Sequence, residues 1–145
     1  MPTPGKPSAL IKPTLDTKFH IDYGWWERTT GEDLRIYLLS HVLPEQRERL
    51  SRAEEGRVVD FVDPETAEVF QLDELRLAIQ LAAKDPAYIT PQTPLIDSIF
   101  RVFLKNNNVP LTPKEIADQI ERSPTTILKT IGGMKIYKGL RPHNP

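Results

Sequence analysis

The sequence lacks cysteine and has little histidine, and these shortages exclude several kinds of site. Without cysteine, the 145-residue chain has no disulfide, no thiolate nucleophile and no cysteine ligand for zinc. Its three histidines, His20, His41 and His143, are scattered and form no metal-ligand motif. Gly-rich phosphate loops, nucleophile elbows and His-Glu metal helices are also missing from the sequence. We therefore expect a protein that is not an enzyme and that uses no metal or cofactor.

Long apolar runs are missing as well. No segment approaches the roughly 20 apolar residues that cross a bilayer, and residues 1–14 contain no uninterrupted apolar stretch of the secretion-signal type. Apolar residues nevertheless make up 39% of the chain, which is enough to form a core. We expect a globular cytoplasmic protein with no membrane partner.

Acidic side chains are absent from the C-terminal end. The net charge of −1 conceals an asymmetry, because residues 1–89 carry 11 Lys and Arg against 16 Asp and Glu, whereas residues 90–145 carry 8 against 4. After Glu121 the only charged side chains are basic, namely Arg122, Lys129, Lys135, Lys138 and Arg141. A positive end of this kind favours a nucleic-acid partner.

The first portion of the chain predicts a small antiparallel sheet with two helices. Residues 1–17 contain four prolines, so we expect a flexible Pro-rich arm. Residues 18–85 form the expected α+β domain: a strand at 18–23, a helix from Glu32 with a stop or restart at Pro44, a hairpin at 57–72, and a helix from Asp73 to about Lys84. Residues 86–93 are the expected linker.

Two features of this portion have a functional and a structural interpretation. Trp25 and Trp26 suit base stacking or partner binding, but adjacent tryptophans after a strand more often place one ring in the core. The hairpin carries a carboxylate cluster that could hold a cation or act as a general acid and base, although such a tip is usually just solvated. Its members are Asp60, Asp63, Glu65, Glu68, Asp73 and Glu74.

Hydroxyl residues directly precede proline three times in the second portion. A hydroxyl accepts a hydrogen bond from the first helical turn, and proline has its dihedral angle preset for the first helical position. The three predicted helix starts are Thr93-Pro94, Thr112-Pro113 and Ser123-Pro124. Thr112 has Glu115 three residues on, which completes a capping box, and Gly132-Gly133 can close the third helix in a left-handed conformation.

Residues 111–131, "LTPKEIADQIERSPTTILKTI", resemble the helix-turn-helix of bacterial winged-helix and related DNA-binding domains. The resemblance implies that residues 94–145 form a three-helix winged-helix-like domain whose third helix enters a major groove. It also implies a wing after the third helix, for which "MKIYKGLRP" is the candidate. Because 12 residues follow Gly133, we expect that wing to be truncated.

The sequence departs from this family at two places. The turn between the helices has Glu121 where the family usually has glycine, so either Glu121 adopts a left-handed conformation or the turn differs. The reading face contains no Arg, Asn or Gln for bidentate base contacts and offers Leu128 to solvent. The nucleic-acid contacts that the resemblance and the basic end together predict are Ser123, Thr125, Leu128, Lys129, Lys135, Lys138 and Arg141.

We therefore expect a nucleic-acid-binding protein, a regulator of transcription that contacts DNA, or alternatively RNA, through a C-terminal helix-turn-helix. The alternative is a protein-interaction module that holds a partner, for example a protein of the transcription machinery, on the same surface. In that case Leu128, Thr125 and the strand around Ile136 and Tyr137 would form the contact, with no nucleic acid involved.

Overall fold

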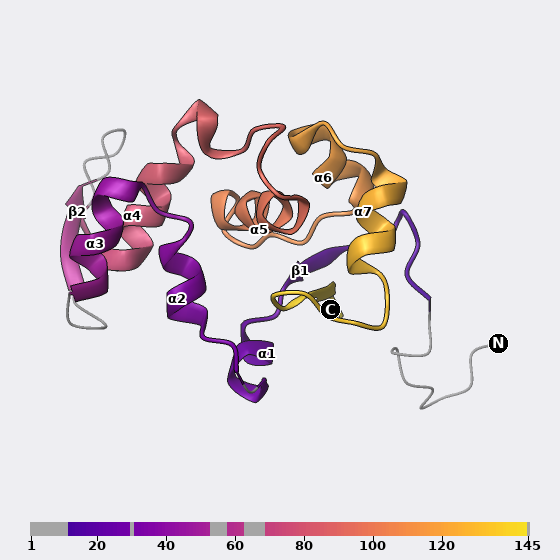
Figure 1. Ribbon diagram of the computed structural model, residues 1–145, viewed down its shortest axis with the longest axis horizontal. Helices are drawn as coiled ribbons and strands as arrows, with labels where there is room; N and C mark the ends of the chain where they lie inside the picture. The colour runs from indigo at the N-terminus through magenta and orange to yellow at the C-terminus, as the bar shows by residue number, and fades with distance from the viewer. Residues whose placement is uncertain (1–11, 30, 53–57, 63–68, 145) are drawn as a thin grey trace. The chain divides into compact units, whose positions relative to one another are not determined.

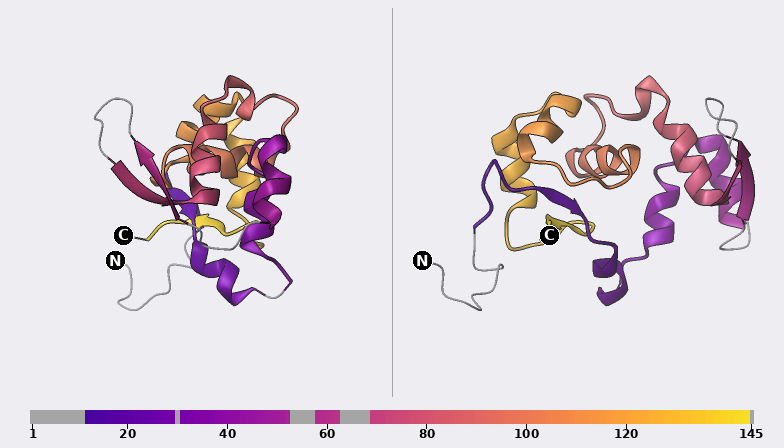
Figure 2. Two further views of the ribbon diagram at one scale, coloured as in Figure 1. Left: turned by 90° about the vertical axis from the view of Figure 1, so that its left-hand side faces the viewer. Right: turned by 180° about the vertical axis from the view of Figure 1, so that it is seen from behind.

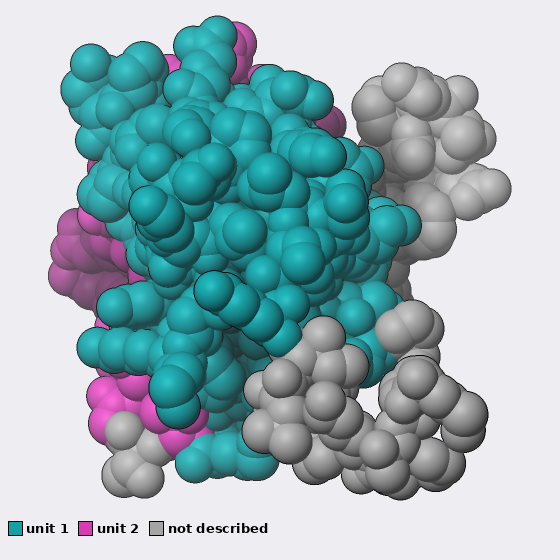
Figure 3. Space-filling view, turned by 90° about the vertical axis from the view of Figure 1, so that its right-hand side faces the viewer, with its two compact units in different colours: residues 1–28, 90–145 teal, residues 29–89 magenta. Residues whose placement is uncertain are grey.

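The structure is a computed structural model that describes residues 12–29, 31–52, 58–62 and 69–144. It divides the chain into two compact units, shown in different colours in Figure 3. Unit 1 comprises residues 1–28 and 90–145, and unit 2 comprises residues 29–89. Helices and short antiparallel strands occur together, so the predicted α+β class is confirmed.

Unit 1 contains the pair of short helices predicted for residues 112–131 and a small sheet (Figure 1). Its elements are β1 (Phe19–Ile21), α1 (Tyr23–Arg28), α5 (Leu95–Lys105), α6 (Pro113–Ile120), α7 (Pro124–Ile131) and β4 (Leu140–Pro142). Helix α5 packs against β1 and against α6, and α6 packs against α7. Figure 2 shows α5 from behind, with β1 and α6 of the same unit beside it.

Strand β1 pairs with β4 in antiparallel register, with His20 opposite Arg141. This pairing differs from the prediction, in which residues 18–23 and the hairpin share one sheet. On its other edge, Phe19 exchanges two backbone hydrogen bonds with Leu111, at 2.7 and 3.0 Å. Strand β1 therefore lies between the start of α6 and the C-terminal strand, so a segment from the first portion of the chain forms part of unit 1.

Asn108 completes the outer edge of β1 with its side chain. Its Oδ1 accepts a hydrogen bond from the Ile21 N–H at 2.8 Å, and its Nδ2 donates to the Ile21 carbonyl at 2.9 Å. Asn108 itself has a φ of 61°, a left-handed conformation that asparagine tolerates better than most residues. One side chain thus takes the place of a neighbouring strand.

Alternation along β1 and apolar faces on the helices build the core of unit 1. Trp26 is in this core, 5% exposed, and its ring meets Phe100 edge to face, whereas Trp25 is half-buried. The structural interpretation of the tryptophan pair is therefore confirmed for Trp26. The other large core side chains are Phe19, Ile21, Ile99, Phe103, Ile116, Ile120, Ile127, Ile131 and Leu140.

Unit 2 consists of short helices and one hairpin. Its elements are α2 (Leu34–Leu39), α3 (Pro44–Arg52), β2 (Val58–Val62), β3 (Val69–Asp73), α4 (Glu74–Ala83) and η2 (Pro86–Tyr88). The predicted hairpin is confirmed, since β2 and β3 pair antiparallel from Val58↔Asp73 to Val62↔Val69. The predicted cap is confirmed as well, because the Asp73 carboxylate accepts from two amides of the first turn of α4.

Two carboxylates of the cluster predicted at the hairpin have structural partners. Asp73 caps α4, and the largely buried Glu74 forms an ion pair with Arg49. The side chains of Asp60, Asp63, Glu65 and Glu68 lie outside the described part of the chain, as do residues 1–11 of the expected arm. Where the structure does describe side chains, no three of His, Asp and Glu gather in a way that would hold a metal ion.

The first of the three hydroxyl-proline pairs does not cap its helix. Helix α5 begins after Pro94 with no side-chain cap, and the Thr93 hydroxyl instead accepts from the Thr90 N–H at 3.0 Å. Thr90 and Thr93 form a local turn that competes for this hydroxyl. None of the helices in the described part of the chain combines the length and apolarity that a bilayer crossing requires.

Candidate nucleic-acid interface

The start of α6 is held by the predicted capping box. The Thr112 hydroxyl accepts from the Glu115 N–H at 3.2 Å, and the Glu115 carboxylate accepts from the Thr112 N–H at 2.9 Å. The bond from the Thr112 amide, with help from its hydroxyl, lowers the pKa of Glu115. Glu115 is therefore ionised at neutral pH, where its charge is favourable at a helix N-terminus.

The turn between α6 and α7 contains a residue in the left-handed conformation, which glycine adopts most readily. Glu121 takes a φ of 55° and a ψ of 42°, and its N–H donates to the Ala117 carbonyl at 2.9 Å. Of the two possibilities left by the sequence, the first is correct: a non-glycine residue adopts the left-handed conformation. Ser123 then caps α7 through the Thr126 N–H, as predicted.

The corner is closed by isoleucines. Ile116, Ile120, Ile127 and Ile131 are all at most 7% exposed, which confirms that they pack inside it. Because these positions fix the inner face of α7, Thr125, Thr126 and Lys129 lie on its outer face, and all three are exposed. The outer face is therefore polar, with one cation and two hydroxyls.

Leu128 differs from its predicted exposure. It is half-buried, and its Cδ1 lies so near Gly132 that a Cβ at Gly132 would sit 3.0 Å from it. Gly132 also departs from prediction, because its φ of −93° is not left-handed. Glycine suits this position because a Cβ would approach the Leu128 carbonyl oxygen to 2.6 Å, so the requirement is one of space.

The predicted wing is reduced to a two-residue turn. Lys138 and Gly139 have positive φ values of 54° and 79°, and the Leu140 N–H donates to the Tyr137 carbonyl at 2.9 Å, as in a type I′ hairpin. The tip packs on α1: the Lys138 ammonium lies 5.9 Å from the Trp26 ring centroid, and a Cβ at Gly139 would lie 3.1 Å from Trp26 Nε1. This turn does not extend outward as a separate wing.

Arg141 lies in an ion-pair group on the outer face of the sheet. It lies 3.5 Å from the Asp22 carboxylate, which also binds Arg28 at 3.0 Å. Burial alone would raise the pKa of Asp22, but the Arg28 hydrogen bond and charge, the Gly24 amide and Arg141 together hold that pKa below its usual value. Arg141 is therefore partly neutralised within unit 1.

Arg122 has a structural role that the sequence did not reveal. Its Nη2 donates to the carbonyl oxygens of Thr93 at 3.2 Å and Pro91 at 3.4 Å, 29 and 31 residues earlier. It thereby ties the turn of the helix pair to the segment before α5. Of the five cations after Glu121, Lys129 and Lys135 are the two that remain exposed.

The two units carry opposite charge. Unit 1 has 12 Lys and Arg against 7 Asp and Glu, a net of +5, whereas unit 2 has 7 against 13, a net of −6. This separation is sharper than the one visible along the sequence, because the N-terminal 28 residues join the basic unit. Family models, curated proteins and solved structures offer no match to this chain.

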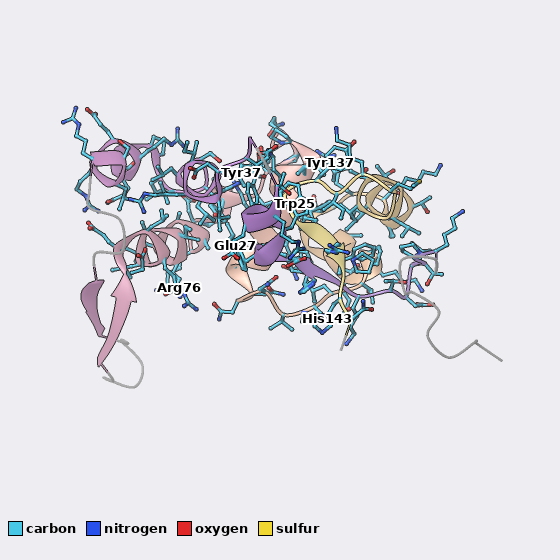
Figure 4. All side chains as sticks on the ribbon, turned by 90° about the horizontal axis from the view of Figure 1, so that it is seen from below. Trp25, Glu27, Tyr37, Arg76, Tyr137 and His143 are labelled. Atoms are coloured by element: carbon cyan, nitrogen blue, oxygen red, sulfur yellow. The ribbon has the colours of Figure 1, made fainter. Side chains whose placement is uncertain are left out.

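Two histidines meet on the outer face of the sheet. His20 on β1 and His143 just after β4 contact edge to face, with ring centroids 4.7 Å apart. Figure 4 shows His143 and Tyr137 on opposite sides of the C-terminal strand. Burial lowers the pKa of His20, and the His143 and Arg141 charges lower it further, while Asp22 opposes them.

This lowered pKa predicts acid destabilisation of unit 1. The unfolded chain binds a proton at His20 more readily than the folded chain does. The contribution of His20 to the free energy of unfolding is therefore complete above about pH 6.5 and is lost as pH falls below it. Thermal melts from pH 8 to pH 5 should show the wild-type midpoint falling and the His20→Gln midpoint falling less. Parallel curves for the two proteins would contradict this assignment.

Proposed function

We propose that unit 1 binds nucleic acid, and duplex DNA in particular, through α7 and the residues that follow it. The observation that carries this proposal is the outer face of α7, where Thr125, Thr126 and Lys129 are exposed on a rigid helix pair in a unit of net charge +5. Hydroxyls and ammonium groups donate to phosphate oxygens, and a major groove admits a helix of this width.

The contacts available on this face suit the DNA backbone more than base edges. Ser123 already uses its hydroxyl oxygen as a helix cap, and Arg141 is paired with Asp22. The face offers no Arg, Asn or Gln, the side chains that make bidentate contacts to bases. We therefore propose low sequence selectivity, with Lys129 and Lys135 as the main phosphate contacts. Regulation of transcription remains the proposed use of this binding.

The protein-interaction alternative has weaker support on α7. Its apolar contact on this helix, Leu128, is half-buried against Gly132, whereas Tyr137 in the segment that follows is 36% exposed. Thr125 is polar and fully compatible with a phosphate contact. The α7 face is therefore better matched to DNA than to an apolar protein surface.

Salt dependence of binding tests the proposal. Fluorescence anisotropy with a labelled duplex of about 16 base pairs should show affinity falling steeply between 50 and 200 mM salt. The double variant Lys129→Ala/Lys135→Ala should reduce the slope of log K against log salt by about 2, one for each lost phosphate contact. Both lysines are exposed, so the fold should be unaffected.

The matched control is Lys84→Ala in unit 2, which removes another exposed lysine, here from the acidic unit. It should leave both the affinity and the salt slope unchanged. Undetectable duplex binding at low salt, or an equal loss in the Lys84 variant, would refute the assignment to α7.

A further inference from the structure

The segment that follows α7 has an unusual surface. Residues 132–137, here called the exposed loop, connect α7 to the type I′ turn, and Met134 in this loop is completely exposed. Tyr137 at its end is 36% exposed, and the Lys135 ammonium lies 5.0 Å from the Tyr137 ring centroid. The loop thus combines a protruding apolar side chain with an adjacent cation.

The position of Met134 is set by ordered structure on both sides. Before it, the Gly132 N–H donates to the Leu128 carbonyl at 2.7 Å and closes α7. After it, Tyr137 is paired with Leu140 across the turn. Met134 is therefore presented by a short loop that is held at both ends and begins directly after the C-terminal end of α7.

We propose that Met134 is an apolar wedge that contacts and partly unstacks a base step when unit 1 binds duplex DNA, with Lys129 and Lys135 on the flanking phosphates. This inference rests on the proposed function. The bases of a duplex offer an apolar surface between two rows of negative phosphates. This surface complements an exposed methionine between lysines in a stretch of sequence without acidic residues. Methionine is one of the side chains that can enter a base step.

Other occupants fit the loop less well. An anionic lipid surface also attracts apolar and cationic groups, but interfacial binding uses the broad apolar face of an amphipathic helix, and the exposed loop is six residues long and not helical. Base stacking on Tyr137 is limited because Lys135 lies over that ring. Met134 is therefore the side chain assigned to the base contact.

A duplex containing 2-aminopurine at a flexible TA step tests this inference, because its fluorescence rises when the base unstacks. The wild-type protein should raise the fluorescence on binding. Met134→Ser should abolish the rise and weaken binding about tenfold, a change equivalent to 1.4 kcal/mol. Met134→Leu keeps an apolar side chain of similar size and should retain both effects. Since Met134 is fully exposed, the melting midpoints of all three proteins should agree.

The possible results separate this inference from the proposed function. Duplex binding with equal affinity and equal fluorescence in Met134→Ser overturns the wedge and leaves the α7 proposal in place. No duplex binding by the wild-type protein overturns both. Vesicles containing phosphatidylserine should not be bound, and Met134-dependent vesicle binding without any 2-aminopurine response would assign the loop to lipid and overturn the wedge.

Discussion

Gly139→Ala should lower the stability of unit 1 by about 3 kcal/mol, because the new methyl group meets two separate obstacles. The first is conformational: Gly139 has a φ of 79°, a region that costs residues with a Cβ about 1–2 kcal/mol. The second is spatial, since the Cβ would lie 2.8 Å from the Asp22 carbonyl oxygen and 3.1 Å from Trp26 Nε1. The expected change in the melting midpoint of unit 1 is about 15 °C downward.

Other glycines of the chain separate these two contributions. Gly31 has a φ of 87° with nothing within 4 Å of the added Cβ, so Gly31→Ala reports the conformational cost alone. Gly133 has neither problem, since an added Cβ would lie 3.9 Å from the Lys129 carbonyl oxygen, an ordinary van der Waals distance. Gly133→Ala should therefore be close to neutral in stability. Urea unfolding should show the largest loss of unfolding free energy in Gly139→Ala, a smaller loss in Gly31→Ala and the smallest in Gly133→Ala. A Gly139→Ala protein as stable as Gly133→Ala would show that the turn does not pack on α1.

Asn108→Asp should destabilise unit 1 by about 2 kcal/mol, because it removes one of the two bonds that hold the outer edge of β1. The remaining oxygen can still accept from the Ile21 N–H, but the group that donated to the Ile21 carbonyl at 2.9 Å becomes a carboxylate oxygen. Two acceptors then face each other at a partly buried site. Thermal or urea unfolding at pH 7 measures the loss.

Asn107 provides the matched control for this substitution. It has the same φ of 61° as Asn108 and is exposed, so Asn107→Asp tests the effect of a new aspartate in the same left-handed conformation. We expect the change in its free energy of unfolding to stay within about 0.5 kcal/mol. Equal losses in the two variants would mean that the Asn108 side chain does not support β1.

Local signals in the sequence were sufficient for the helix pair. Thr112 with Glu115, and Ser123 with Pro124, carry their capping chemistry within four residues, and the isoleucine spacing specifies which face is buried. These features depend on the chain only over one or two helical turns, which is why the structure confirms them. The prediction that Thr93 caps α5 is wrong because the nearby Thr90 amide donates to its hydroxyl instead.

The partners of a strand that lie far along the chain could not be predicted from such local signals. The alternation in residues 18–23 indicated a half-buried strand, but it contained no information about which strand lies beside it. The partners, Leu111 and β4, are about 90 and 120 residues further along the chain. The asparagine that completes this edge could be suspected from "NNN", since asparagine tolerates left-handed conformations, but its target could not.

The structure differs most from the predicted site in where the basic side chains lie. Five cations after Glu121 looked equivalent in the sequence, yet Arg122 binds backbone carbonyls, Arg141 is paired with Asp22, and Lys138 lies over Trp26. Their partners all come from distant segments of unit 1. Lys129 and Lys135 are the two of the five that are exposed, although Lys135 also lies over the neighbouring Tyr137 ring. The predicted basic surface is therefore reduced to these two lysines, with Met134 between them in sequence as the added contact.

Backbone amide NMR during titration with a short duplex is the most direct test of the claim that α7 binds DNA. We predict that the largest chemical-shift changes fall on residues 123–130 and 133–135, and that they shrink as salt is raised from 50 to 200 mM. Residues 31–52 and 73–89 of unit 2 should keep their shifts. Changes concentrated in unit 2, or an unaltered spectrum at low salt, would contradict the account.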